Sequence, residues 1–132
     1  MDFTIGELSK QGGISSQTIR YYERQQLVGP KYRTDSGYRV YDEEALRRLG
    51  FIKHAKDVGF TLKEIKELLG MDPESREGVL QIRGKTVDKL KEVQDKIEEL
   101  QKIENELSGM VEKCEKDEST NSRCQIIKHL EN

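Results

Sequence analysis

The chain has 132 residues, 33% of them hydrophobic and 36% charged, with no tryptophan and a mean hydropathy of −0.83. So short and polar a chain holds little apolar material for an isolated globule, and we expect an elongated, helix-rich protein that completes its core by pairing with a second copy. No apolar run is long enough to span a membrane, and MDFTIGELSK lacks the layout of a signal peptide. The protein is therefore expected in the cytoplasm, where cysteines stay reduced.

The charge is distributed unevenly along the chain. The net charge is −2, but residues 1–70 carry twelve Lys and Arg against ten Asp and Glu, whereas residues 71–132 carry eleven against fifteen. Nucleic-acid binding requires a local basic face and not a basic whole. The asymmetry permits DNA binding by the first half without establishing it.

Two short helices joined by a glycine turn are expected at the N-terminus. Thr4, followed three residues later by Glu7, is typical of a capping box at the start of a helix that Gly12 and Gly13 then end. A second helix is expected from the serine pair at 15 and 16 through QTIRYYE. This arrangement predicts a helix-turn-helix.

A small β-wing and two more helices are expected next. In GPKYRTDSGYRVYD a cluster of turn formers precedes residues of alternating character at 38–41, which is strand periodicity after a tight turn. Asp42 is expected to cap a helix that ends at Gly59. Thr61, with Glu64 three residues on, begins a further helix that ends at Gly70.

A long charged helix follows a linker at residues 71–80. Apolar residues recur on it at alternating steps of three and four, with Glu104 at one expected apolar position; they are Leu90, Val93, Ile97, Leu100, Leu107 and Val111. Such a stripe is typical of a coiled-coil seam. The chain has no second long helix to cover it, so residues 81–112 predict a homodimer.

The tail KCEKDESTNSRCQIIKHLEN contains both cysteines, Cys114 and Cys124, separated by nine polar residues. The pair is compatible with a disulfide, a metal site, a redox switch or no function at all. Soft thiolates select Cu(I), Ag(I), Au(I), Zn(II), Cd(II) and Hg(II) over hard ions. No His or Asp partner for a nucleophilic thiol is apparent and no phosphate-cradling loop is present, so an enzyme is not expected.

The stretches TIRYYE, SGYRVYDE and GFTLKEI, in this order and spacing, resemble the MerR-family DNA-binding domain. With the long helix and the cysteine tail, the resemblance to the family's metal-sensing branch, with its copper and zinc sensors, covers essentially all 132 residues. It implies an all-α protein with a small β-wing: a winged helix-turn-helix at 1–70, an antiparallel coiled coil, and an effector-binding loop with a short helix at 113–132. It also implies a homodimer that distorts double-stranded promoter DNA, whose −35 and −10 elements are spaced too widely, for RNA polymerase.

The residues expected to contact DNA are Thr18, Arg20 and Tyr21 on the recognition helix, Arg33, Tyr38 and Arg39 in the wing, and Lys53 on the helix after it. Arg20 can pair with a guanine edge or a phosphate. Tyr22 is equally compatible with a phosphate contact and with the core. Arg33 and Lys31 are as compatible with solvated charges as with phosphate contacts.

The resemblance makes Cys114 and Cys124 the metal ligands. Gln125 stands where the family often has proline, and the spacer exceeds that of the copper sensors by two residues. Where sensors of divalent ions place a third cysteine, this chain aligns Val79, which cannot ligate. Two thiolates suit a linear monovalent ion, so the resemblance favours Cu(I), with Ag(I) and Au(I) as mimics, over Zn(II) or Hg(II).

Other interpretations of the tail stay open. Arg83, one turn beyond Val79, is placed to help neutralise an S–metal–S unit of net charge −1. His129 could assist a divalent ion, although a surface imidazole is the simpler interpretation. A reversible Cys114–Cys124 disulfide would make the protein a redox sensor, and incidental cysteines would leave a DNA-binding adaptor without effector.

Overall fold

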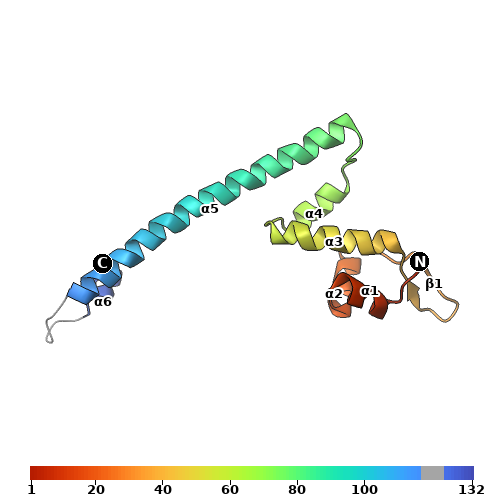
Figure 1. The fold of residues 1–132 in the computed structure, drawn as a ribbon, viewed down its shortest axis with the longest axis horizontal. Coiled ribbons are helices and arrows are strands. Elements are labelled where there is room, and N and C mark those ends of the chain that lie inside the picture. The colour runs from red at the N-terminus through yellow and green to blue at the C-terminus, as the bar shows by residue number, and fades with distance from the viewer. Residues whose placement is uncertain (117–123) are drawn as a thin grey trace. The chain divides into compact units, whose positions relative to one another are not determined.

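The computed structural model describes residues 1–116 and 124–132 and divides into two compact units, residues 1–85 and 86–132. The elements in chain order are α1 (Ile5–Gly12), α2 (Ser16–Arg24), β1 (Tyr32–Arg33), β2 (Arg39–Val40), α3 (Glu43–Asp57), α4 (Leu62–Leu69), α5 (Arg76–Lys116) and α6 (Gln125–Glu131) (Figure 1). The expected mainly helical fold with a small wing is confirmed. No helix among the described residues is long and apolar enough to cross a bilayer.

The helix-turn-helix begins as its sequence predicts. The Thr4 hydroxyl accepts from the Glu7 backbone N–H at 3.1 Å, and the Glu7 carboxylate accepts from the Thr4 N–H at 3.1 Å. Gly13, at φ +66°, ends α1 in the left-handed region, which glycine adopts without strain. The Ser15 hydroxyl then accepts from the Thr18 N–H at 3.1 Å and starts α2.

The wing is a two-stranded antiparallel hairpin in which Tyr32 pairs with Val40 and Arg33 with Arg39. Its turn is closed by the Thr34 N–H donating to the Tyr38 carbonyl at 2.8 Å and the Gly37 N–H donating to the Thr34 carbonyl at 2.8 Å. Gly37 has φ +88°, a backbone conformation that other residues adopt only with strain. The turn therefore places Tyr38 at the tip of the hairpin, next to the paired Arg33 and Arg39.

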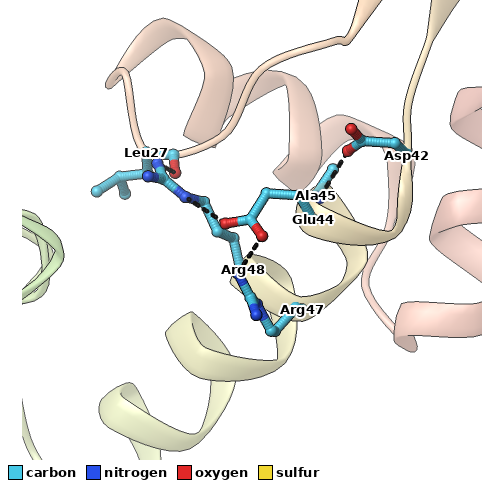
Figure 2. A network of polar contacts seen from close by, with 6 residues as sticks. All are labelled: Leu27, Asp42, Glu44, Ala45, Arg47 and Arg48. Atoms are coloured by element: carbon cyan, nitrogen blue, oxygen red, sulfur yellow. Dashed lines mark hydrogen bonds and ion pairs between the residues drawn. The ribbon is translucent and has the colours of Figure 1, made fainter. Parts of the chain in front are cut away.

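The core of the first unit lies where α1 packs against α2 and α3, and α3 against α4. It contains Phe3, Leu8, Ile19, Tyr22, Leu27, Val28, Tyr41, Ala45, Leu49, Ile52, Ala55 and Ile65. Arg48 on α3 makes polar contacts beside this core. Its Nη1 donates to the Leu27 carbonyl at 3.2 Å, and its Nε lies 3.6 Å from the Glu44 carboxylate (Figure 2). The segment after the recognition helix is thereby held to α3.

Helix α5 begins at Arg76, inside the stretch 71–80 expected to be a linker, and includes the whole of 81–112. Ser75 explains this start, since its hydroxyl accepts from the Gly78 N–H at 2.9 Å and caps the first turn. An ion pair between Lys85 and Glu67 joins α5 to α4 within the first unit. The apolar periodicity of the sequence marks the stripe along such a helix and not the residue at which the helix begins.

Gly78 is required by the close approach of the chain before α5. A Cβ added there would lie 1.8 Å from the Asp72 carbonyl oxygen and 2.9 Å from the Asp72 nitrogen, whereas one at Gly84 meets nothing within 4 Å. We expect Gly78→Ala to lower the free energy of unfolding by about 1–3 kcal/mol, as overpacking does, and Gly84→Ala in the same helix to raise it by up to ~1 kcal/mol. Urea unfolding of both variants measures this; equal stabilities would contradict it.

In the second unit, apolar side chains remain uncovered along α5. Leu90, Val93, Ile97, Leu100, Leu107 and Val111, the predicted stripe, are all exposed. Helix α6 lies alongside the end of α5 (Figure 1), where the His129 Nε2 is 2.7 Å from the Glu106 carboxylate and Met110 is buried. Such a row of exposed apolar residues marks an interaction surface.

Candidate DNA-binding surface and metal site

Helix α2, the expected recognition helix, separates its two tyrosines. Tyr22 is 6% exposed and belongs to the core, whereas Tyr21 is 42% exposed, which answers the question the sequence left open. Arg20 is exposed, whereas Thr18 is half-buried and its hydroxyl accepts from the Ser15 hydroxyl at 2.9 Å. Arg20 and Tyr21 are thus available to a ligand.

Of the four wing residues considered for DNA contact, three are exposed and one is restrained. Tyr38, at the tip, is 74% exposed and Arg33 is exposed. Lys31 is also exposed but lies 3.6 Å from Asp2. Arg39 is different, because its Nε lies 3.1 Å from the Glu23 carboxylate on α2. The wing is therefore tied to the recognition helix through Arg39.

Tyr41, the first residue after β2, completes this link. It is fully buried, pairs with Phe3 through backbone hydrogen bonds of 2.7 and 2.8 Å, and donates its hydroxyl proton to Glu23. Burial raises the pKa of the Tyr41 hydroxyl far above its ordinary value of 10.0, and the hydrogen bond to Glu23 and that carboxylate's charge raise it further. The positive charges of Arg39 and Arg20 act in the opposite direction and lower this pKa.

This raised pKa predicts a loss of stability in alkali. Below pH 10 the hydroxyl is protonated in the folded and the unfolded chain, so its contribution is constant. Above about pH 10 the unfolded chain releases the proton while the folded protein retains it, so the free energy of unfolding falls as pH rises. Tyr41→Phe should fall less steeply between pH 9 and 11 in urea unfolding. The exposed Tyr38→Phe should follow the wild type; parallel curves for all three would contradict the argument.

The basic residues in the second half of α3 are exposed. Lys53, His54 and Lys56 are all exposed. The Lys53 Nζ comes within 3.2 Å of the position that a Cβ would take at Gly13. Lys53 therefore stands over the end of α1, close to the turn of the helix-turn-helix.

The two cysteines stand at the ends of the segment between α5 and α6. Cys114 lies near the end of α5, Cys124 is the N-cap residue of α6, both are exposed, and no disulfide joins them. Residues 117–123 of the expected loop lie outside the described residues. In the described ranges, no three His, Cys, Asp or Glu side chains gather in a group that could hold a metal ion.

Val79 and Arg83 both lie near the start of α5, in the first unit. The Val79 side chain is 49% exposed, so the described residues of the protomer leave about half of it uncovered. Arg83 is exposed as well. The expected influence of both residues on the metal stays a prediction.

Sequence reasoning missed Glu23, Tyr41 and Arg48, which hold the elements of the DNA-binding unit together. The Glu23–Tyr41 and Arg48–Leu27 hydrogen bonds join residues 18 and 21 positions apart, beyond the reach of capping or periodicity rules. A glutamate in the last turn of a helix, where a negative charge is unfavourable, was the one signal that could have pointed to them.

Comparison with known proteins agrees with this arrangement. Residues 3–72 match the MerR HTH family regulatory proteins and residues 46–110 match the family model described as "MerR, DNA binding". The mercuric resistance operon regulatory protein of Bacillus cereus is 39% identical over 130 residues, 98% of each chain. The HTH-type transcriptional regulator ZntR of Escherichia coli K12 is 38% identical over 131 residues, 98% of this chain and 92% of its own.

Among solved structures, the transcription regulator PbrR691 from Ralstonia metallidurans, crystallised with lead(II), superposes with a TM-score of 0.82 at 33% identity, over 97% of this chain and 98% of that one. The likeness therefore includes the helix-turn-helix, the long helix and the tail. The family matches and the near-complete coverage at 39% identity show that this chain belongs to the MerR family of helix-turn-helix regulatory proteins, which are transcription regulators and not enzymes.

Proposed function

We propose that the protein is a homodimeric regulator that binds promoter DNA and alters transcription by RNA polymerase when a thiophilic metal ion binds Cys114 and Cys124. The observation that carries this is the exposed thiol pair, at the end of α5 and the start of α6, on a chain that begins with a winged helix-turn-helix. In this proposal residues 1–70 bind DNA, the segment from 71 to the start of α5 links, residues 81–112 dimerise and residues 113–132 hold the effector. The relatives compared above are bacterial proteins, and bacterial promoters lie in the cytoplasm, so the proposed function is a cytoplasmic one.

The DNA-binding part of the proposal rests on the exposed residues of α2 and the wing. Arg20 and Tyr21 would enter the major groove, while Arg33, Tyr38 and Arg39 would meet the backbone beside it. Lys53 on α3 would add an outer phosphate contact, and Thr18, half-buried, a contact near the start of the recognition helix. A dimer fixes the spacing of two such units and can bend and untwist the duplex between them.

The metal part rests on the donor set. Two thiolates suit linear Cu(I), Ag(I) or Au(I), and Val79 supplies no third ligand. The resulting net charge of −1 would favour a nearby cation such as Arg83. The relatives named for mercury and lead keep divalent ions, including Zn(II), as the second candidate, with a further ligand from the partner or from solvent.

A redox sensor is the rival from another class, and one observation favours it: both thiols are exposed and flank the same short segment. Oxidation would join Cys114 and Cys124 in a disulfide and release two electrons and two protons to an oxidant such as a peroxide. A DNA-binding protein whose cysteines have no role is the third possibility.

An anaerobic transcription assay on a promoter that the protein binds separates these functions. Cu(I), Ag(I), Zn(II), Hg(II) or a peroxide is added singly, and the transcript output is measured. We expect Cu(I) and Ag(I) to change the output at the lowest concentrations. A response to peroxide but to no metal would establish the redox sensor, and no response to either would leave the adaptor.

Val79→Cys tests the proposed selectivity. A third thiolate should shift the preference toward divalent ions, and we expect Hg(II) or Zn(II) affinity to rise at least about 10-fold relative to Cu(I). Competition with a chelator of known affinity measures both. Val79→Ser, which adds a hard oxygen donor of similar size, is the matched control; an equal shift in both variants would contradict the argument.

A further inference from the structure

Glu23 occupies the junction between the recognition helix and the wing. It lies in the last turn of α2, and its side chain is only 12% exposed. One carboxylate oxygen accepts the hydroxyl proton of Tyr41, and the other lies 3.1 Å from the Nε of Arg39. A single carboxylate therefore joins α2 to β2 and to the residue that follows it.

The Tyr41 hydroxyl is a fixed partner. Its ring is fully buried, its backbone is bridged to Phe3, and the next residue, Asp42, caps α3 through its hydrogen bond from the Ala45 N–H at 3.2 Å. Burial and Glu23 raise the pKa of this hydroxyl, so it remains a proton donor throughout the physiological range. Glu23 is thus held in one place by a donor that cannot move away from it.

Arg39 is held at one end only. Its Nε is buried, and that N–H does not point at the Glu23 oxygen closely enough for a hydrogen bond, so the two groups form an ion pair. The side chain is nevertheless 36% exposed, and this exposed part belongs to its other atoms. A guanidinium anchored in this way keeps donors available for an anion.

We propose that Glu23 is a positioning residue that presets the Arg39 guanidinium for contact with a DNA phosphate beside the recognition helix. The inference rests on the proposed DNA-binding function of the wing. A long side chain ordered before binding loses less entropy when DNA arrives. Against this gain stands the negative charge of Glu23, which repels the duplex, so the two effects predict opposite results when the charge is removed.

The test uses Glu23→Gln, Arg39→Ala and the double variant of the full-length protein. Each binds a duplex that the wild type has selected from a randomised pool, at several salt concentrations. We expect Glu23→Gln to weaken binding on the order of 10-fold, since each of the two wings in a dimer then has a less ordered arginine. We also expect the salt slope to decrease by up to ~0.9 for each phosphate that the variant no longer reaches. The double variant should be no weaker than Arg39→Ala alone.

Each other outcome overturns the inference in a recognisable way. Tighter binding by Glu23→Gln would show that the carboxylate mainly repels DNA. Lower thermal stability with an unchanged salt slope would show a structural role only. Normal binding and slope in Arg39→Ala would remove the wing contact itself, and with it the wing assignment of the proposed function. A defect in Arg39→Ala without one in Glu23→Gln would remove the positioning role alone.

Discussion

Replacing either Cys114 or Cys124 with serine is expected to weaken Cu(I) binding at least about 100-fold, because removal even of an outer partner of a metal ligand commonly costs 10–100-fold. A serine hydroxyl is a hard, protonated donor that a soft ion does not accept. Both cysteines are exposed and lie outside the DNA-binding unit, so DNA affinity without metal should not change. Anaerobic titration against a competing Cu(I) chelator measures the first effect, and DNA binding measures the second.

His129→Gln is the control for this result. The His129 imidazole contacts Glu106 at 2.7 Å, so its removal should leave Cu(I) affinity near that of the wild type. A decrease in His129→Gln as large as in the cysteine variants would make the imidazole a ligand. If the double-serine protein still bound Cu(I) with full affinity, the metal site would lie elsewhere.

Ile97→Glu is expected to dissociate the proposed dimer and abolish tight operator binding. Ile97 lies in the middle of the apolar stripe and is 60% exposed in the single protomer, so the change disturbs nothing within it. Removing two buried isoleucines per dimer would cost about 3–6 kcal/mol, roughly a 10²–10⁴-fold weaker association. The buried carboxylates add to this cost. Sedimentation equilibrium over a range of protein concentrations measures the dissociation constant.

Lys102→Gln provides the matched control for the stripe. It changes the net charge by the same single unit, at an exposed position of α5 outside the stripe. This variant should remain dimeric at the concentrations at which the wild type is dimeric. Equal dissociation of both variants would indicate a general charge effect, and a wild-type monomer would refute the coiled coil.

Much of the fold follows from local rules because the contacts that decide it are local. Both capping boxes, at Thr4 with Glu7 and at Thr61 with Glu64, join residues three apart and form as expected. The wing hairpin follows from its turn residues in the same way. The sequence predicted that the long helix begins at residue 81, five residues after its actual start at Arg76. Apolar spacing indicates which part of a helix is covered, and it does not indicate where the N-cap lies.

The candidate DNA-binding surface was only partly accessible to this reasoning. Residue type and position identified Arg20 and Arg39 as candidates for DNA contact, and the structure leaves Arg20 exposed. Which of Tyr21 and Tyr22 faces outward depended on which side of α2 faces the core, since neighbouring residues on a helix point about 100° apart and the sequence does not show which direction is covered. Only the packed unit shows that Tyr22 is the buried one.

Short stretches of sequence were enough to establish the family resemblance, the order of the elements and the presence of a thiol pair, because each depends on residues close together in the chain. The packed structure was needed to show that Glu23 joins Tyr41 to Arg39 and that Arg48 reaches the Leu27 carbonyl. These contacts form between elements that meet when the core assembles. A pairing across that distance is fixed by the whole arrangement of helices, and no short-range pattern encodes it.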